Sequence, residues 1–334
     1  MRTLRLLIVC FALLCAPAAA QAQTWTSIFY YPWYGNPARD GTWEHWLGPG
    51  GSAFGITSNY YPARGLYSSS NRGIVTAQMR EIAASGVREL VYSWWGWGSP
   101  EDVRLPLVIK AANAAGLSVA VHLEPYPGRN AESIAGDVEH LEALGIERFF
   151  VYQPFEGISP DAWPALREQL PPVQLFAETG SAGRASAGEF DGLYTYDILR
   201  WSGATFKRLC RAAHQARLLC LPSVGPGYEA SRATGDLRVK PRRDGATYDA
   251  MWRAAIQSAA DGVTITSYNE WHEGTQIEPA RARRGGAAAS VFESYDGAWG
   301  RQGRAAERAY LDRTAYWTDA FARARPPIFG HADD

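Results

Sequence analysis

The sequence predicts a (β/α)8 barrel, in which eight parallel strands form a closed core and helices cover its outside. Two observations favour this fold. Eight short runs of apolar and aromatic residues alternate with longer stretches of helical periodicity, as in successive βα units. The roughly 310 residues left after a predicted N-terminal signal also suit one barrel with extended loops. We therefore expect α/β architecture in a single domain.

The eight predicted strands are near-continuous apolar or aromatic runs, the pattern of parallel strands that are covered on both faces. In chain order they are Ser27–Tyr31, Glu89–Ser93, Ser118–Leu123, Arg148–Tyr152, Val173–Ala177, Gly192–Tyr196, Leu218–Val224 and Gly262–Ser267.

Helical patterns separate most of these strands. The first three predicted helices are each followed closely by a glycine, the residue that most often ends a helix. Gly180–Glu189, between the fifth and sixth strands, is small and polar, so a helix there should be short or missing. The predicted helices are Ile74–Ala84, Val103–Ala115, Ala131–Ala143, Asp161–Gln169, Gly203–Gln215, Tyr248–Ala260 and Gln302–Ala322.

An open, doubly wound sheet is the alternative fold. Its nucleotide-binding form needs a glycine-rich turn after the first strand, whereas Pro32-Trp33-Tyr34-Gly35 follows here. In a barrel, the long segments Gly41–Ser70 and Thr275–Arg301 would be βα loops that extend the C-terminal face. No internal repeat or low-complexity tract interrupts the pattern, so residues 23–334 are predicted to be one catalytic domain.

The N-terminus has the pattern of an export signal. Arg2 and Arg5 form a basic segment, Leu6–Cys15 is apolar, and Ala20-Gln21-Ala22 offers a cleavage site. A membrane anchor is the alternative, but the apolar run is well short of the ~20 residues that span a bilayer. We expect residues 1–22 to be removed and the mature chain, without a membrane span, to be periplasmic or extracellular.

Charge and composition narrow the class of partner. The formal net charge is −1, with 33 basic and 34 acidic residues. The chain therefore has no excess of positive charge with which to bind nucleic acid or an acidic membrane. The 13 Trp and 17 Tyr residues are numerous, and their amphipathic rings suit a cleft that stacks on flat polar ligands such as sugars. A carbohydrate is therefore the partner that composition favours.

Cys210 and Cys220 remain after removal of the signal. In an oxidising compartment they would form a disulfide; the alternative is two small, buried, unlinked thiols. The chain lacks a C-x-x-C pair, and its six His are scattered, so no metal site is predicted.

Polar and aromatic residues follow six of the predicted strands. Barrel enzymes build active sites at this end of the strands, although some of the rings could simply close the top of the barrel. The candidate substrate-binding residues are Tyr31, Tyr34, His45, Trp95, His122, Glu124, Tyr126, Tyr194, Tyr196, Tyr228, Asn269, Trp271 and His272.

Glu270 and Glu273 are the candidate catalytic residues, in the segment that leaves the eighth strand. Glycoside hydrolysis usually needs two carboxyl groups, and a spacing of three places both on one side of a turn. Crowding should push their pKa values apart, so that one is protonated and one ionised. The alternative is a solvated cluster at a helix start.

Other candidate groups are weaker. Glu124 could grip sugar hydroxyls or tune the pair, or it could instead bind an arginine such as Arg129. The histidines are predicted as substrate contacts only. The sequence does not support serine hydrolase or zinc protease chemistry, because it contains neither G-x-S-x-G nor H-E-x-x-H.

At these residues the chain resembles glycoside hydrolase family 99, the endo-α-1,2-mannosidases and endo-α-1,2-mannanases. The most specific matching segment is long and contains both glutamates, and the others precede it in family order. They are Phe29–Gly35, His122–Tyr126, Asp191–Tyr196, Pro222–Tyr228 and Ile265–Glu278.

The resemblance implies an endo-acting, retaining hydrolase of mannose-containing oligo- or polysaccharides, with a (β/α)8 barrel and no metal or organic cofactor. It implies that Glu270 deprotonates the substrate's own 2-hydroxyl, which attacks the anomeric carbon to form a 1,2-anhydro sugar. It also implies that Glu273 protonates the leaving oxygen and later activates water.

Two segments depart from the family pattern. Residues 228–248 are shorter than expected and rich in arginine, and the second strand ends in Trp94-Trp95-Gly96-Trp97-Gly98, in a loop that shapes the subsite before the cleavage point. A glucosylated mannose, an α-mannan or another polysaccharide with an axial O2 all remain candidate substrates. A non-catalytic glycan-binding protein and a transglycosylase or lyase are the alternative functions.

Overall fold

The computed structural model describes residues 25–47, 56–282 and 292–324. The predicted signal, residues 1–22, lies outside these ranges. Within them, one parallel sheet has the strand order β7-β6-β5-β4-β3-β2-β1-β11-β8. Its strands are β1 Trp25–Tyr30, β2 Glu89–Trp94, β3 Ser118–Leu123, β4 Arg148–Val151, β5 Gln174–Glu178, β6 Gly192–Tyr194, β7 Leu219–Leu221, β8 Ser223–Val224 and β11 Gly262–Ile265.

Pro222 divides the seventh predicted strand into β7 and β8, because proline has no N–H to donate to the sheet. On one side of it, Leu221 of β7 pairs with Tyr194 of β6. On the other, Ser223 of β8 pairs with Thr264 of β11. The interrupted strand therefore joins the two ends of the sheet, and the predicted (β/α)8 barrel is confirmed.

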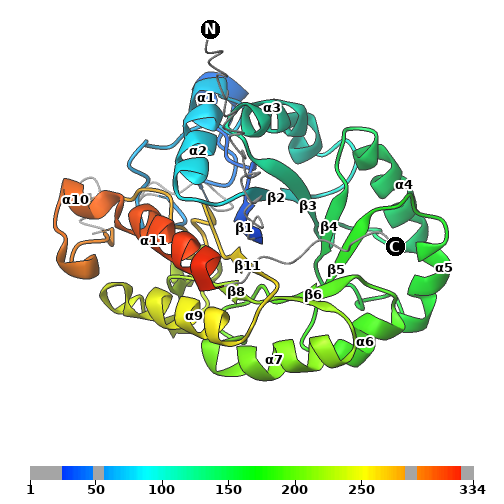
Figure 1. The fold of residues 1–334 in the computed structure, drawn as a ribbon. Helices are drawn as coiled ribbons and strands as arrows, with labels where there is room; N and C mark the ends of the chain where they lie inside the picture. The colour runs from blue at the N-terminus through cyan, green and yellow to red at the C-terminus, as the bar shows by residue number, and fades with distance from the viewer. Residues whose placement is uncertain (1–24, 48–55, 283–291, 325–334) are drawn as a thin grey trace, which may run out of the picture.

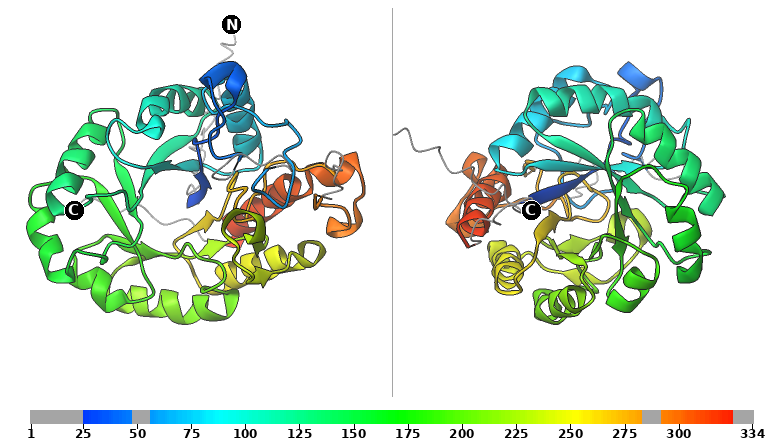
Figure 2. Two further views of the ribbon diagram at one scale, coloured as in Figure 1. Left: turned by 180° about the vertical axis from the view of Figure 1, so that it is seen from behind. Right: turned by 45° about the vertical axis from the view of Figure 1, so that its right-hand side comes forward.

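Helices surround the strands as a ring (Figure 1), which the views in Figure 2 also show. The helix after β11, α11, contacts both α9 and α2, so the last and first βα units are neighbours. The helices that cover the barrel are α2 Arg72–Ala84, α3 Pro100–Ala114, α4 Ala131–Glu142, α5 Trp163–Arg167, α6 Ala182–Ala187, α7 Gly203–Gln215, α9 Ala246–Gln257 and α11 Ala309–Ala324.

Most predicted helices are present, and the differences lie at their ends. The predicted helix Asp161–Gln169 is a 3-10 turn, η1 Pro160–Ala162, followed by α5. Gln302–Ala322 is not continuous but is divided into α10 Arg304–Glu307 and α11. Within Gly180–Glu189, where a helix was expected to be short or missing, the structure has the six-residue α6.

Side-chain caps explain where several helices begin. Asn71 accepts backbone N–H groups at the start of α2, and Ser99 does so at α3. Asn130 and Ser133 satisfy each other's backbone N–H groups at the start of α4 in a reciprocal capping box. Such caps fix the point at which each loop of the mouth enters a helix.

Cys210 of α7 and Cys220 of β7 form a disulfide, with Cα atoms 5.2 Å apart. Both residues are also fully buried. The sequence left two alternatives for these cysteines, a disulfide or two unlinked thiols, and the structure supports the disulfide. This bond ties a covering helix to the barrel.

Three long loops, which follow β1, β8 and β11, pack on one another. Tyr60 of the first loop pairs with Glu293 of the third, and Pro62 pairs with Ala280. The second loop contains the hairpin β9 Tyr228–Glu229 and β10 Val239–Lys240, the short helix α8 Ser231–Thr234 and the 3-10 turn η2 Arg243–Gly245. The first also carries α1 Pro37–Asp40, and the third η3 Ala298–Gly300. All three extend from the C-terminal ends of their strands, as predicted for the first and third.

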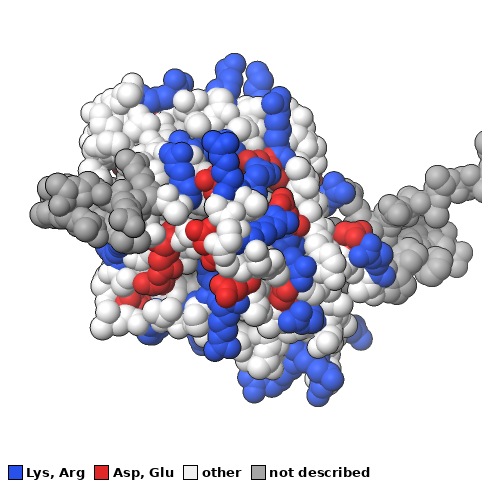
Figure 3. Space-filling view, turned by 90° about the vertical axis from the view of Figure 1, so that its left-hand side faces the viewer, with Lys and Arg blue, Asp and Glu red and all other residues white. Residues whose placement is uncertain are grey.

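Both signs of charge are interspersed on the face shown in Figure 3. None of the helices in the described ranges is long and apolar enough to cross a membrane.

Candidate active site

The segment that follows β11 folds into a closed loop with the two candidate glutamates at its tip. Its base is tied by backbone hydrogen bonds from Ser267 N to Thr275 O (3.0 Å) and from Ile277 N to Ser267 O (2.9 Å). Glu278 N donates to Tyr268 O at 2.8 Å. These bonds make residues 267–278 a rigid frame, which we call the catalytic loop.

Glu270 and Glu273 are held differently within this loop. Glu270 is buried, and its Oε1 accepts the backbone N–H of His272 at 3.0 Å. Glu273 is half-buried, and its Oε2 accepts the hydroxyl of Tyr196 at 3.1 Å. The structure thus gives each carboxyl group its own hydrogen-bond donor.

Burial dominates the acid–base properties of the pair. It raises the pKa of Glu273 to about 7, with smaller contributions from other carboxylates nearby. Burial, followed by the negative charge of Glu273, raises the pKa of Glu270 well above its usual range, and the N–H of His272 opposes this shift. Because ionising one carboxyl group disfavours ionising the other, the pair holds one proton near neutral pH. One protonated and one ionised carboxyl group is what acid–base chemistry requires.

A chain of hydroxyl groups leads to Glu273. Tyr31 OH donates to Tyr196 OH at 2.5 Å, and Tyr196 donates in turn to the carboxylate. The two tyrosines come from the ends of β1 and β6, strands on different sides of the barrel. The predicted convergence of strand ends is therefore present at this point.

A second cluster is centred on Glu124, at the end of β3. Its Oε1 accepts from Ser93 at 2.7 Å and lies 2.8 Å from His122 Nδ1. The other ring nitrogen of His122 lies 2.8 Å from Tyr194 OH. Arg129, the alternative partner, donates instead to three backbone carbonyls. Since the charge of Glu124 raises the pKa of both catalytic candidates, it belongs to the same site.

An aromatic wall lies beside His272 of the catalytic loop, and sequence reasoning missed its centre, Trp33. The Trp33 ring stacks on His45 at 4.5 Å, and its centroid is 6.2 Å from Trp95. His272 lies 6.3 Å from it, and burial lowers the pKa of His272, so this imidazole is neutral at neutral pH. The Trp33 side chain is half-buried, but its Nε1 atom is enclosed by the protein, so the ring face is the part that it can offer to a ligand.

Three other candidates lie behind the catalytic pair instead. Tyr34, Asn269 and Trp271 are fully buried. Tyr34 OH donates to Asn269 O at 2.9 Å and accepts from Trp271 N at 3.1 Å. The Asn269 amide binds both backbone polar groups of Tyr31, at 2.8 Å each. Their polar atoms are engaged within the protein, so they orient the loop from behind.

Tyr126 and Tyr228 lie further from the pair. Tyr126 OH donates to Asp137 and lies 2.9 Å from Ser133 Oγ, both on α4, so the structure directs it toward a covering helix. Tyr228 OH donates to Asp236 at 3.0 Å, and its ring borders a cavity of about 180 Å³ together with Glu273. Other residues of this cavity that sequence reasoning did not select are Tyr152, Asp197 and Arg238.

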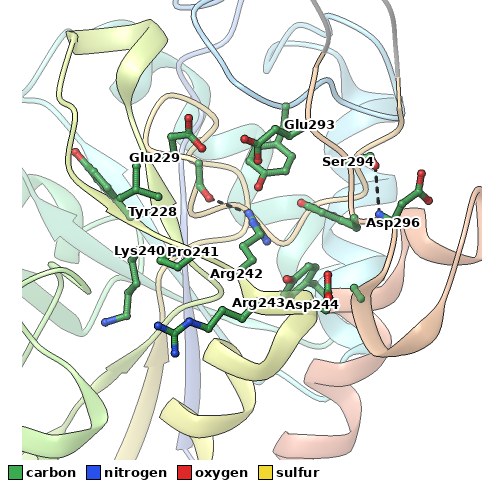
Figure 4. A pocket seen from close by; sticks show the side chains of 16 residues that line it. Tyr228, Glu229, Lys240, Pro241, Arg242, Arg243, Asp244, Glu293, Ser294 and Asp296 are labelled. Atoms are coloured by element: carbon green, nitrogen blue, oxygen red, sulfur yellow. Dashed lines mark hydrogen bonds between the residues drawn. The ribbon is translucent and has the colours of Figure 1, made fainter.

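A separate pocket of about 330 Å³ lies beside Tyr228 and Gly274 (Figure 4). Arg242, at its centre, donates to the carbonyls of Gly274 and Gln276 at 2.8 and 2.7 Å. Three tyrosine rings surround the guanidinium at 4.6–4.8 Å, which stabilises a buried cation. Arg242 therefore supports the catalytic loop from the outer side. The rings belong to Tyr60, Tyr295 and Tyr310.

Comparison with known proteins decides the family. A family model described as glycosyl hydrolase family 99 matches residues 21–150 and 173–323. The chain belongs to glycoside hydrolase family 99. It is therefore a glycoside hydrolase, and the resemblance seen in the sequence is confirmed.

Relatives within family 99 agree in sequence and structure. A Danio rerio glycoprotein endo-alpha-1,2-mannosidase-like protein is 28% identical over 356 residues, which cover 89% of this chain and 78% of the relative. A Xenopus laevis glycoprotein endo-alpha-1,2-mannosidase is 27% identical over 361 residues, with 89% and 77% covered. The solved family 99 endo-alpha-mannosidase from Bacteroides thetaiotaomicron superposes with a TM-score of 0.80 at 30% identity, over 90% of this chain and 98% of that one.

In the described part of the chain, no group of three or more His, Cys, Asp or Glu residues is arranged to hold a metal ion.

Proposed function

We propose that this hydrolase cleaves internal α-1,2-mannosidic bonds in mannose-containing glycans, with retention, through a 1,2-anhydro sugar. The observation that carries the proposal is the pair Glu270 and Glu273 on one closed loop, where burial keeps one proton on two carboxyl groups. The endo-mannosidase descriptions of the family 99 relatives support the substrate class and the endo action.

In the first step, ionised Glu270 takes the proton of the 2-hydroxyl of the mannose before the cleavage point. The freed O2 attacks C1, and the bond between C1 and the leaving oxygen breaks. Protonated Glu273 gives its proton to that oxygen, so the leaving glycan departs neutral. This step uses the arrangement in which the single proton of the pair lies on Glu273. Burial by itself favours the proton on Glu270, and the backbone N–H of His272 opposes that preference by stabilising the ionised form of Glu270.

In the second step, the roles reverse. Glu273, now ionised, takes a proton from water, whose oxygen attacks C1. The bond between C1 and O2 breaks, and Glu270 returns the proton to O2. Two inversions at C1 give net retention, and both carboxyl groups regain their starting protonation states.

Mannose suits this route because its axial O2 lies trans to an α-linked leaving group. O2 can therefore attack C1 from the face opposite the departing oxygen. The aromatic wall of Trp33 and Trp95 offers apolar surfaces on which sugar rings can stack. The neutral imidazole of His272 and the carboxylate of Glu124 can bind hydroxyl groups beside them.

The proposal is tested by incubating the protein with α-1,2-mannan and sizing the products. Endo action predicts new internal reducing ends, which Glu270→Gln and Glu273→Gln should each abolish without loss of folding. Binding of mannan without new reducing ends would instead favour the non-catalytic glycan-binding protein. Product analysis in ¹⁸O-labelled water distinguishes hydrolysis from transglycosylation or elimination.

Export is also part of the proposed function. We propose that residues 1–22 direct the chain out of the cytoplasm, where it would meet glycans. N-terminal sequencing of the protein secreted by its host should find Gln23 first; a protein that retains Met1 in the cytoplasmic fraction would contradict this.

A further inference from the structure

A third carboxyl group, Glu278, lies behind the catalytic loop and takes no part in the two steps above. It is fully buried and is surrounded by donors. Its Oε2 accepts from Tyr67 OH at 2.7 Å and from Trp271 Nε1 at 3.1 Å. Its Oε1 accepts from Gln78 Nε2 at 2.9 Å. When Glu278 is ionised, both of its oxygens therefore act as acceptors.

Glu278 determines the direction of the hydrogen bonds around it. Because Tyr67 gives its only hydroxyl proton to Glu278, the oxygen of Tyr67 is free to accept. It accepts from Asn269 Nδ2 at 3.2 Å and from Trp271 Nε1 at 3.3 Å. The side chains on both sides of Glu270 in the sequence thus bind, directly or through one hydroxyl, to Glu278.

The same network reaches Glu273 from the other side. Asn269 binds the backbone of Tyr31 through both amide atoms. The hydroxyl of Tyr31 donates to Tyr196, which donates to Glu273. A displacement of Asn269 would therefore change the positions of both catalytic carboxyl groups.

A carboxyl group at this position is costly. Burial raises its pKa to about 7, and the ion pair with Arg64, whose Nε lies 3.5 Å away, offsets only part of that shift. Glutamine or an apolar residue would avoid that cost. The cost is understandable if the two acceptor oxygens are needed to hold Trp271 and Tyr67 in one arrangement.

We propose that Glu278 is a positioning residue that fixes Glu270 and Glu273 through Trp271, Tyr67 and Asn269. This inference rests on the proposed function, since it assumes that Glu270 and Glu273 are the reacting pair. Glu278 acts through its neighbours and does not touch substrate.

The neighbouring Gln78 allows a sharp test, because Gln78 Oε1 accepts from Tyr30 OH at 2.7 Å. In Glu278→Gln, the new side-chain NH2 group faces the NH2 group of Gln78, so two hydrogen-bond donors face each other. In the double variant Gln78→Glu/Glu278→Gln, the amide at 278 donates to the carboxylate at 78, which still accepts from Tyr30. The oxygen at 278 again accepts from Tyr67 and Trp271. The double variant keeps the net charge and restores the hydrogen-bond pattern.

Glu81→Gln is the matched control. Glu81 pairs with the same Arg64 at 2.7 Å and accepts from Tyr268 OH at 3.0 Å, but it has no contact with Trp271 or Tyr67. It removes the same charge from the same side of the barrel. A change shared by both single variants would report charge or general stability, and a change confined to Glu278→Gln would report positioning.

The experiment measures kcat and KM on α-1,2-mannan for the wild type, the two single variants and the double variant. We expect Glu278→Gln to lower kcat on the order of 10- to 100-fold with KM little changed, as misplacement of reacting groups does. Glu81→Gln should keep wild-type kcat, and the double variant should recover most of the loss. If Glu278→Gln does not fold, the double variant alone decides by its kcat.

An unchanged kcat in Glu278→Gln, or a folded double variant that stays as slow as the single one, would overturn the positioning role. Cleavage by the wild type in the same assay separates this failure from failure of the proposed function. A wild type without activity on mannan contradicts the function, whereas an active wild type with an indifferent Glu278 contradicts only the inference.

Discussion

The hydroxyl of Tyr196 donates a hydrogen bond to Oε2 of Glu273 at 3.1 Å. This contact joins the end of β6 to the catalytic loop after β11. It also stabilises the ionised form of Glu273 and so lowers its pKa against the larger effect of burial. The wild-type balance leaves that pKa at about 7, where a general acid works best near neutral pH.

Tyr196→Phe should therefore raise the pKa of Glu273 further. In the wild type, kcat/KM is expected to fall as pH rises through about 7, because Glu273 loses the proton it must donate. In Tyr196→Phe this fall should move to higher pH. Tyr31→Phe, which keeps the bond between Tyr196 and Glu273, is the control and should move it less. An alkaline limb at the same pH in all three proteins would contradict the assignment.

Glu278 should make folding stability depend on pH. Its folded pKa of about 7 lies above the usual 4.5, so between these values the folded state keeps a proton that the unfolded state loses. Stability is thus highest below about 4.5 and falls as pH rises through 7, by about 3 kcal/mol for this group.

Urea unfolding of the wild type and Glu278→Gln at pH 5 and pH 8 measures this contribution. The free energy of unfolding of the variant should change less between the two pH values. Glu81→Gln should keep most of the pH dependence, and it should lower the pKa of Glu278 slightly, because the charge of Glu81 raises that pKa. The same pH dependence in wild type and Glu278→Gln would show that burial of this group carries no such cost.

Trp33 should contribute to substrate binding through its half-buried ring, which stacks on His45. Trp33→Phe is expected to raise KM for mannan several-fold, because it removes part of the stacking surface. Trp317→Phe is a suitable control, since Trp317 lies on the covering helix α11, where it stacks on Trp252 of α9. Equal KM values for the two variants would remove Trp33 from the site.

The disulfide between Cys210 and Cys220 should stabilise the barrel without affecting chemistry. The variant Cys210→Ala/Cys220→Ala is expected to lose about 2–3 kcal/mol of stability, given a closed loop of about ten residues. Its kcat should be unchanged, because neither cysteine contacts the catalytic loop. Wild-type protein treated with reductant should unfold at the same urea concentration as the variant; loss of kcat would instead connect this bond to the site.

Much of the barrel was predictable because its signals are local. Buried parallel strands are apolar runs, and covering helices show helical periodicity, so Ser118–Leu123 and Gly203–Gln215 were predicted with the observed ends. The interruption at Pro222 was missed because a single proline in an apolar run gives little sign of whether the strand resumes. The disulfide stayed open because its formation depends on how α7 packs against β7.

The predicted site was harder to divide into roles. Glu270 and Glu273 could be selected from the sequence, because they lie three residues apart in one distinctive segment. Trp271 and Asn269 looked like sugar contacts, since sequence does not reveal whether a side chain at a strand end faces the mouth or the interior. The supporting network was not predictable, because Tyr67, Gln78 and Glu278 come from separate parts of the chain, up to about 200 residues apart.

The most direct test of the account concerns the nucleophile. If the substrate's own O2 attacks C1, an activated mannosyl donor with fluorine in place of that hydroxyl should be neither cleaved nor captured. Intact-mass spectrometry after incubation should find only unmodified protein, while the 2-hydroxyl parent compound is turned over. A stable covalent sugar adduct on Glu270 would contradict the account, because it would make that carboxylate the nucleophile itself.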